Sequence, residues 1–355
     1  MSNVVNLVIE VGGVPVRVAP NGDSPEAIAS FEDLIRRLKT TSVTARIPQA
    51  MTSPSRQVRV LLSVDFDAVS GWLGTGQHPR NCLADYSSGF FAGHVGVSRL
   101  VRLFKRLDIA DKMTWFIPGH SMETFPAETQ LIIDSGAEVA LHGYCHEDCT
   151  RLSTQQEKDI FEKCIKLAES LTGKKPVGYR APLYRLREET IELLESEGFL
   201  YDSSLSGHDS QLYQLAKGPS PEPVDYSQPA KTWMRPCAVP EPSKVVEIPA
   251  NWYMEDMTPL QYLPNVENSN GYVPSQSIER MWQDRFTWLW NHGPDGEGPA
   301  DFVFPLILHP DTSGMAHIIG AIESMILWMK GHGTQVEFVT YATVARSYLS
   351  QKGHE

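Results

Sequence analysis

The sequence predicts an α/β protein built on a parallel sheet or a (β/α) barrel. From Val58 onward, short apolar segments alternate with longer segments of helical periodicity, the pattern of parallel strands joined by helices. Polar and titratable residues stand at the ends of several apolar segments, as Asp65, His142 and His309 do. In (β/α) barrels the chemistry gathers at the carboxyl ends of strands, so these positions also predict an active site.

The first 55 residues are expected to form an extension on a catalytic domain that covers residues 56–355. Residues 7–18 alternate apolar and polar side chains on both sides of two glycines, which predicts a small hairpin. A serine and a proline start a helix predicted over residues 24–38. Residues 40–56 are polar and contain two prolines, so they are interpreted as a linker.

The main domain contains seven predicted strands and five predicted helices. The strands are Val58–Val64, Met113–Ile117, Glu138–Leu141, Val177–Tyr179, Val245–Ile248, Phe302–His309 and Val336–Val339. The helices are Val97–Leu107, Gln156–Leu171, Glu188–Glu197, Ser277–Trp290 and Ile318–Lys330, each with apolar residues at helical spacing. Residues 207–242 are rich in proline and serine and predict a long surface excursion, and residues 293–299 predict a Gly/Pro loop.

Composition and charge exclude several classes of function. The chain has 355 residues, 41% hydrophobic and 21% charged, and its net charge of -12 argues against nucleic acid or an anionic membrane as partner. No apolar stretch approaches the ~20 residues that span a bilayer, and the N-terminus lacks a secretory pattern. The five cysteines fit a reducing compartment. We therefore expect a cytoplasmic protein, and a cytoplasmic enzyme does not normally meet assembled cell-wall polymer.

The segment His142-Gly143-Tyr144-Cys145-His146 is the strongest chemical signal in the chain. Two imidazoles four residues apart share one face if a helix begins at His142, and neutral imidazole binds zinc and similar ions. Two surface histidines are the plain alternative. A structural zinc site that adds Cys145 and Cys149 is another, although four ligands from so short a segment fit a tetrahedral ion poorly.

Asp65 and Asp67 lie two residues apart at the end of the first apolar segment of the main domain. Residues two apart on a strand share a face, so both carboxylates point into one cavity while Phe66 points away. Two buried like charges are costly unless a cation lies nearby. A metal ion on Asp67 would meet that requirement and leave Asp65 free as a base. A pair of solvated carboxylates is the alternative.

Arg180 and His309 complete the predicted catalytic set. Arg180 stands at a strand end before a proline-rigidified turn, where its planar guanidinium would hold Asp65 in place and keep it ionised. His309 ends an apolar strand and would donate a proton to a leaving nitrogen, with Asp311 as the residue that orients it. For each side chain taken alone, an ordinary residue at a strand end is the favoured interpretation, and for Arg180 the context of the other motifs favours the functional one.

Five residues near these motifs are predicted to line the substrate pocket. Trp72, Trp115 and Tyr184 supply aromatic walls, with packing in the core as the alternative for each of them. His120 follows the predicted strand that contains Trp115 and is the best of the remaining histidines for a pocket role. The backbone N–H near Leu183 is expected to stabilise an oxyanion.

Taken in order, these motifs resemble the polysaccharide deacetylase family, the NodB-homology domain. The resemblance covers about residues 57 to 350 and implies a distorted (β/α) barrel with an Asp-His-His metal site, usually zinc. It implies Asp67, His142 and His146 as metal ligands, Asp65 as base, Arg180 as the residue that orients the base and His309 as acid. The matching elements are Ser63-Val64-Asp65-Phe66-Asp67, His142-Gly143-Tyr144-Cys145-His146, Arg180-Ala181-Pro182 and Leu306-Ile307-Leu308-His309.

Two departures from the family pattern point to one branch of the family. The first motif continues as Asp65-Phe66-Asp67-Ala68 where the family often has Asp-Asp-Gly, and Ala181 replaces the first proline of the usual Arg-Pro-Pro. Residues 68–74, 115–126 and 246–253 resemble an intracellular branch, which includes peptidoglycan deacetylase-like proteins and cyclic imide hydrolases.

These observations predict a metal-dependent hydrolase of an amide-type C–N bond. An N-acetylated sugar or oligomer and a small amide or cyclic imide both suit this chemistry as substrates. A non-catalytic carbohydrate-binding barrel is the rival from another class, but it predicts missing motif residues, and all six are present. Zinc is the expected metal, with cobalt, nickel and manganese as alternatives. The N-terminal extension offers strand addition as a route to a homo-oligomer.

Overall fold

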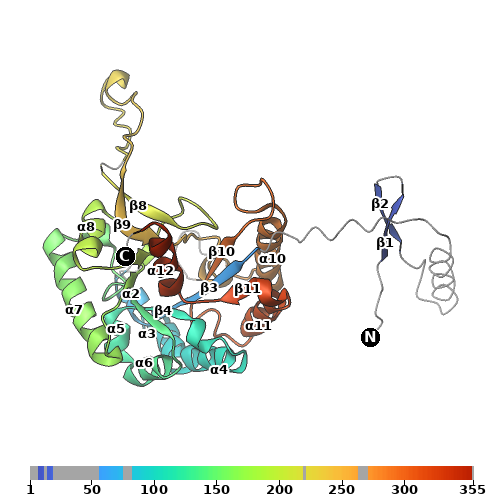
Figure 1. Cartoon of the computed structure of the whole chain (residues 1–355). Coiled ribbons are helices and arrows are strands. Elements are labelled where there is room, and N and C mark those ends of the chain that lie inside the picture. Colours follow the sequence, from blue (N-terminus) through green and yellow to red (C-terminus); the bar gives the residue numbers. More distant parts are fainter. Residues whose placement is uncertain are drawn as a thin grey trace. The chain divides into compact units, whose positions relative to one another are not determined.

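The computed structural model describes residues 7–11, 14–18, 56–74, 82–218, 221–262 and 271–353 (Figure 1). The chain divides into two compact units, Met1–Ser53 and Pro54–Glu355. In the first unit, strands β1 (Leu7–Val11) and β2 (Val14–Val18) pair antiparallel, as the alternation predicts. The predicted helix over 24–38 and nearly all of the predicted linker lie outside the described residues.

The second unit is built around a nine-stranded, mainly parallel sheet that curls into an open, distorted barrel. The order of the strands is β10-β3-β4-β5-β6-β7-β9-β8, and β11 also pairs with β3. Only β8 runs antiparallel to its neighbour. The strands are β3 (Val58–Asp65), β4 (Thr114–Ile117), β5 (Glu138–Leu141), β6 (Gly178–Tyr179), β7 (Tyr201–Asp202), β8 (Tyr213–Lys217), β9 (Glu241–Glu247), β10 (Phe302–Leu308) and β11 (Val336–Phe338).

Strand β3 pairs with β10, β4 and β11, and its two faces have different surroundings. One face carries Val58 and every second residue to Val64, and these apolar side chains belong to the core between the sheet and the helices. The other face carries Leu61, Ser63 and Asp65, which point into the barrel. Because β3 is buried on both faces, its sequence is almost continuously apolar until the polar residues at its carboxyl end.

The barrel closes irregularly between β9 and β10. The segment after β9 forms a bridge to β10 instead of a full strand, with Glu255 paired to Ile307. The Ile307 N–H donates to the Met254 carbonyl at 2.9 Å, and the Asp256 N–H donates to the Ile307 carbonyl at 3.2 Å. This bridge brings residues 254–256 beside the end of β10, where His309 follows.

Helices cover the outer face of the sheet (Figure 1). The five predicted helices are present as α4, α7, α8, α10 and α11, within a few residues of the expected bounds. The helices of the described residues are α2 (Ser70–Gly74), α3 (Leu83–Phe91), α4 (Ser98–Arg106), α5 (Gly119–Thr124), α6 (Pro126–Ile133), α7 (Thr154–Thr172), α8 (Glu188–Ser196), α9 (Met257–Leu260), α10 (Ser275–His292), α11 (Ile319–Lys330) and α12 (Tyr341–Gln351). A π-helical turn, Ala92–Val97, joins α3 to α4.

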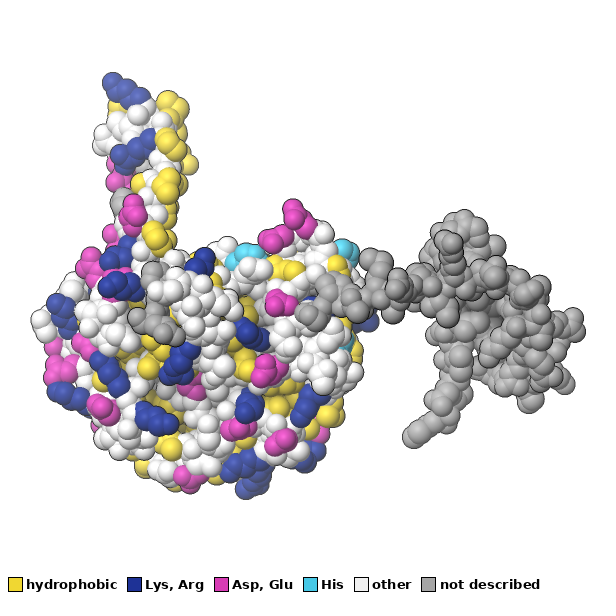
Figure 2. All heavy atoms as spheres, viewed as in Figure 1, with side chains coloured by type: hydrophobic (Ala, Val, Ile, Leu, Met, Phe, Trp, Pro, Cys, Tyr) yellow, Lys and Arg dark blue, Asp and Glu magenta, His cyan; other side chains and the backbone are white. Residues whose placement is uncertain are grey.

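The surface excursion predicted over 207–242 is present only between β8 and β9, because its first part contains strand β8, whose Leu215 is buried, and β9 already begins at Glu241 (Figure 1). Its described residues from 221 to 240 are almost all exposed. None of the helices described here is long and apolar enough to span a lipid bilayer. On the face of the second unit drawn in Figure 2, acidic and basic side chains are interspersed and form no continuous basic surface.

Two buried carboxyl groups face each other across β7 and β9. Asp202 and Glu247 are directly paired in the strand register, and both are fully buried. Glu247 Oε1 accepts the Ser204 and Leu205 N–H groups at 2.9 and 2.8 Å, and Asp202 Oδ1 accepts the Ser204 hydroxyl at 2.9 Å. Burial raises the pKa of Asp202 to about 6 and holds the pKa of Glu247 well above its usual value. The pair therefore retains a proton that an unfolded chain releases.

Replacing Glu247 by glutamine is predicted to change how stability depends on pH. A folded pKa raised above the unfolded one means that stability is full below the unfolded pKa, near 4.5, and falls as pH rises toward the folded pKa. Glu247→Gln keeps the Oε1 acceptor and carries a permanent N–H donor. Because the amide does not titrate, the variant should not lose this stability as pH rises. The free energy of unfolding of Glu247→Gln, relative to wild type, should rise by up to about 1.4 kcal/mol per pH unit above pH 5. Urea titrations at pH 5, 6 and 7 measure the difference, and parallel pH profiles would contradict it.

Candidate metal centre and catalytic site

Three buried side chains meet at the carboxyl end of the barrel. Asp67, His142 and His146 each present one donor atom, and the three atoms lie within 4.8 Å of one another. His142 Nε2 lies 3.4 Å from Asp67 Oδ1, and His146 Nε2 lies 3.6 Å from Asp67 Oδ2. The residues come from two segments far apart in sequence, as the motif spacing predicts.

Specific contacts orient Asp67 and His142, whereas His146 Nδ1 has no hydrogen-bond partner among the described residues. The Asp67 carbonyl accepts the Ser70 N–H at 2.9 Å and the Ser121 hydroxyl at 2.8 Å, which fixes the turn after β3. His142 Nδ1 lies 2.7 Å from the Arg180 carbonyl. A carbonyl oxygen only accepts, so Nδ1 carries the proton and Nε2 presents its lone pair to the site.

The two histidines do not share a helix, which corrects the interpretation of their spacing. Residues 142–148 form an irregular loop, in which Gly143 has φ 67° and His146 has φ 56°. The rings nevertheless meet, with centroids 5.0 Å apart. Glu147 stabilises the loop by accepting the N–H groups of Tyr144 and Cys145, at 2.9 and 2.5 Å.

The donor set fits a divalent cation. The separations of 3.4 and 3.6 Å are too long for hydrogen bonds, but they suit neighbouring ligands of one ion with bonds of about 2.0–2.2 Å. Asp67 Oδ1 is buried and has no hydrogen-bond partner among the described residues. Burial raises the pKa of Asp67 and lowers the pKa of His146 to about 4. A cation would stabilise the Asp67 carboxylate, and the neutral imidazoles are ready to bind it.

Asp65 lies beside this group and is bound by Arg180. Arg180 Nη1 donates to Asp65 Oδ1 at 2.5 Å and to the Ser63 hydroxyl at 3.0 Å. Its Nε and Nη2 donate to the Ser203 carbonyl and hydroxyl at 2.9 and 3.0 Å. Burial alone would raise the pKa of Asp65, but the charges of Arg180, His142 and His309 together outweigh it, with Arg180 as the largest of the three, and the net shift is downward. The carboxylate therefore stays ionised although it is 2% exposed.

His309 approaches the same carboxylates from β10. Its Nε2 lies 4.0 Å from Asp65 Oδ2 and 3.8 Å from Asp67 Oδ2. Its Nδ1 donates to Asp256 Oδ1 at 2.7 Å. Burial would lower the pKa of His309, but Asp256 and the other carboxylates raise it well above its usual value.

Asp256, and not Asp311, orients His309, which corrects the prediction from sequence. Asp256 Oδ2 also accepts the His309 N–H at 2.9 Å and the Ser313 N–H at 3.1 Å, so the carboxylate fixes both ends of the loop. Asp311 instead accepts from Gln261 Nε2 at 2.8 Å. The sequence did contain a weak signal, because Asp256 follows a strand as the other site carboxylates do, but eight residues, 248–255, separate it from the end of β9 at Glu247.

The predicted pocket residues fall in different places. Trp115 is fully buried on the helix-covered face of β4, edge-on to Phe66 and Phe104, so its side chain belongs to the core and does not line the site. Trp72 is buried in α2. His120 is half-buried at the start of α5, and its N–H donates to the Tyr144 carbonyl of the metal-binding loop at 2.8 Å.

Leu183 and Tyr184 lie immediately after Arg180 in an unusual backbone conformation. Both have left-handed φ angles, 58° and 56°. Tyr184 packs edge-on against Trp252, and its hydroxyl donates to Glu255 Oε2 at 3.2 Å. Among the described residues no acceptor pairs with the Leu183 N–H. An unpaired N–H on a strained turn is what an oxyanion donor requires.

The cysteines next to the metal group take no part in it. Cys149 donates its thiol to the Arg185 carbonyl at 3.0 Å, and no metal-binding group of the described residues contains Cys145 or Cys149. Burial raises the pKa of both thiols to about 11, so both stay protonated. The arrangement therefore gives no support to a structural zinc site built on cysteine.

Comparisons with known proteins show the family to which this chain belongs. Residues 92–201 match the model of the polysaccharide deacetylase family. The peptidoglycan deacetylase-like protein FGM2 of Gibberella zeae is 62% identical over 95% of this chain and 99% of its own. The peptidoglycan deacetylase of Helicobacter pylori is 38% identical over 84% of this chain and 98% of its own. A crystal structure of a putative polysaccharide deacetylase from Mycobacterium smegmatis superposes with TM-score 0.69 at 25% identity, covering 84% and 92% of the two chains.

Metal uptake tests the assignment of the three ligands. Wild-type protein stripped of metal should bind one divalent ion per chain in a titration against a chromophoric chelator. His146→Ala removes one donor and should weaken binding by at least about 100-fold. His120→Ala is the matched control, because it removes a nearby imidazole outside the group, and it should bind like wild type. Equal affinity of His146→Ala and wild type would show that the three residues are not the ligands.

Proposed function

Because this chain belongs to the polysaccharide deacetylase family, we propose that it removes the acetyl group from an N-acetylated sugar or short oligosaccharide. One observation carries this proposal. A carboxylate held ionised by a buried arginine, Asp65, lies beside a buried Asp-His-His group. That combination places a base next to a cation site, with Asp65 Oδ2 3.8 Å from His142 Nε2, and hydrolysis of an amide by water requires both.

Asp67, His142 and His146 would hold the metal ion. Two nitrogen donors and one carboxylate oxygen suit zinc, which we propose as the resident metal. When bound, the ion would polarise the carbonyl oxygen and lower the pKa of a water molecule. The other steps belong to residues of the chain itself.

Asp65 is the proposed general base. Its Oδ1 accepts from Arg180, while Oδ2 lies 3.8 and 4.0 Å from His142 Nε2 and His309 Nε2 and accepts no hydrogen bond from the described residues. A base must be ionised before the reaction, and the Arg180 contact ensures this despite burial. Oδ2 is thus the atom that takes the proton from the attacking water.

The oxyanion and the leaving nitrogen have separate proposed partners. The Leu183 N–H would donate to the carbonyl oxygen as negative charge develops on it, without a reorganisation of the backbone. His309 would give a proton from Nε2 to the departing nitrogen. Its Nδ1 is committed to Asp256, so Nε2 is the nitrogen that can exchange the proton.

The substrate class rests on the family and on the named relatives. Both curated relatives carry peptidoglycan deacetylase in their names, which favours an N-acetyl sugar. Ring opening of a small cyclic imide uses the same base, acid and oxyanion donor and is the competing reaction. Acetate release from chitooligosaccharides, compared with ring opening of succinimide on the same metal-loaded sample, decides between them. Ring opening without acetate release would overturn the deacetylase proposal.

Asp65→Asn tests the general base. The amide keeps the shape of the side chain but cannot take the proton, so turnover should fall by ~10²–10⁴-fold. Metal content should stay at one ion per chain, because Asp65 is outside the ligand group. The substitution leaves Arg180 without its counter-charge, so a thermal melt must first show a folded variant. A folded, metal-loaded Asp65→Asn enzyme with near-normal turnover would refute this role.

Tyr184→Phe tests the positioning of the oxyanion donor. Phenylalanine keeps the packing on Trp252 but loses the hydrogen bond to Glu255, so the turn at Leu183 is held less firmly. A hydrogen bond of this kind is worth up to ~1.5 kcal/mol, so kcat should fall by about 10-fold with KM nearly unchanged. Steady-state kinetics on the best substrate of the panel measures both constants. A raised KM with normal kcat would indicate a substrate contact instead.

A further inference from the structure

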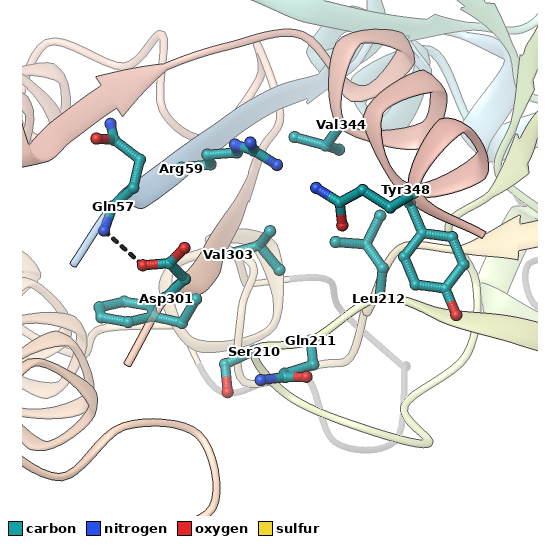
Figure 3. A pocket seen from close by; sticks show the side chains of 11 residues that line it. Gln57, Arg59, Ser210, Gln211, Leu212, Asp301, Val303, Val344 and Tyr348 are labelled. Carbon is teal, nitrogen blue, oxygen red and sulfur yellow. Dashed lines mark hydrogen bonds between the residues drawn. The ribbon is translucent and has the colours of Figure 1, made fainter. Parts of the chain in front are cut away.

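A second concave site lies at the other end of the barrel (Figure 3). It is a cavity of about 250 Å³ between the starts of β3 and β10, the segment before β8 and the last turns of α12. Arg59, on β3, lines it, and Asp65, six residues later on the same face, belongs to the catalytic site. Six residues of strand extend about 20 Å, so the two sites are separate.

Arg59 is the only lysine or arginine in the lining of this cavity. Figure 3 shows its side chain reaching in from β3 among Leu212, Val303 and Val344. No acceptor or carboxylate of the described residues pairs with its guanidinium, whereas the buried Arg180 and the half-buried Arg285 have fixed partners. A half-enclosed guanidinium without a partner is a binding group for an anion.

The other lining groups restrict the kind of anion. Asp301 lies at the rim, where one oxygen accepts the Gln57 N–H at 2.8 Å, and its charge disfavours a dianion such as phosphate. Leu212, Val303 and Val344 supply the apolar part of the lining. The cavity is smaller than the ~300–1,000 Å³ typical of sites for drug-sized ligands, so it suits a molecule of a few heavy atoms.

We infer that this cavity binds a small organic monocarboxylate, with its carboxylate on Arg59 and a short apolar body against Leu212, Val303 and Val344. One bidentate contact and a small apolar area give an affinity on the order of millimolar. The inference is independent of the proposed reaction, because none of its residues belongs to the metal group or touches Asp65.

Binding of isobutyrate to metal-loaded, full-length protein tests the inference. Saturation-transfer NMR at constant ionic strength should show saturable binding of isobutyrate, and its uncharged isostere isobutyramide should bind at least about 10-fold more weakly. Arg59→Gln should reduce the affinity for isobutyrate by at least about 10-fold, which is the contribution expected of one charge-assisted pair. Arg102→Gln, which removes the same charge from an exposed position on α4, should bind like wild type.

Two results would overturn the inference. One is equal binding of the acid and the amide by the wild-type protein, which needs no variant. The other is undiminished binding by folded Arg59→Gln. If Arg59→Gln does not fold, Leu212→Trp fills the cavity while Arg59 stays, and this variant should also lose isobutyrate binding. Metal uptake should be unchanged in every folded variant, so failure here and failure of the proposed deacetylase activity are distinguishable.

Discussion

The ion pair between Arg180 and Asp65 is the contact on which the rest of the site depends. Burying both charges is costly unless every donor finds an acceptor, and Arg180 meets this condition through Ser63, Ser203 and Asp65. Its guanidinium also lies 3.9 Å from the Phe116 ring. These partners belong to β3, to β4 and to the segment after β7, so the arginine ties the strands together inside the barrel. Its own carbonyl orients His142, which links the base to the metal ligands.

The two carboxylates at the end of β3 have different roles because their surroundings differ. Asp65 faces a permanent cation supplied by the protein, and its pKa is lowered. Asp67 faces two neutral imidazoles, has one oxygen without a hydrogen bond, and its pKa is raised in the absence of metal. Only the second carboxylate needs an added cation. The different surroundings therefore suit Asp65 to the role of base and Asp67 to the role of metal ligand, although both are aspartates only two positions apart.

Sequence reasoning identified the site through strand ends and motif order, and it failed where contacts are made by irregular chain. Asp65, Asp67, His142, Arg180 and His309 all follow apolar strands, so a parallel sheet alone predicts that they meet. Asp256 follows an irregular bridge, and no local pattern indicates that it reaches His309. Trp115 was placed wrongly because alternation along a strand fixes which residues share a face, but it does not say which face is covered by helices. Tyr341 is missed for another reason: it reaches Arg180 from α12, and the sequence pattern did not lead to a predicted helix there.

Strained backbone is concentrated at the catalytic end of the barrel. Six residues other than glycine have left-handed φ angles among those described, and four of them are Ala68, His146, Leu183 and Tyr184. Each such residue costs on the order of 1–3 kcal/mol. Hydrogen bonds and an ion pair hold the loops in place, including the buried contact of Ser121 with the Asp67 carbonyl and the partly buried contacts of Arg185 with Asp148 and Tyr184 with Glu255. The free energy of folding offsets this strain, so the ligands and the oxyanion donor are oriented before a substrate binds. Substrate-binding energy is then not needed to order them.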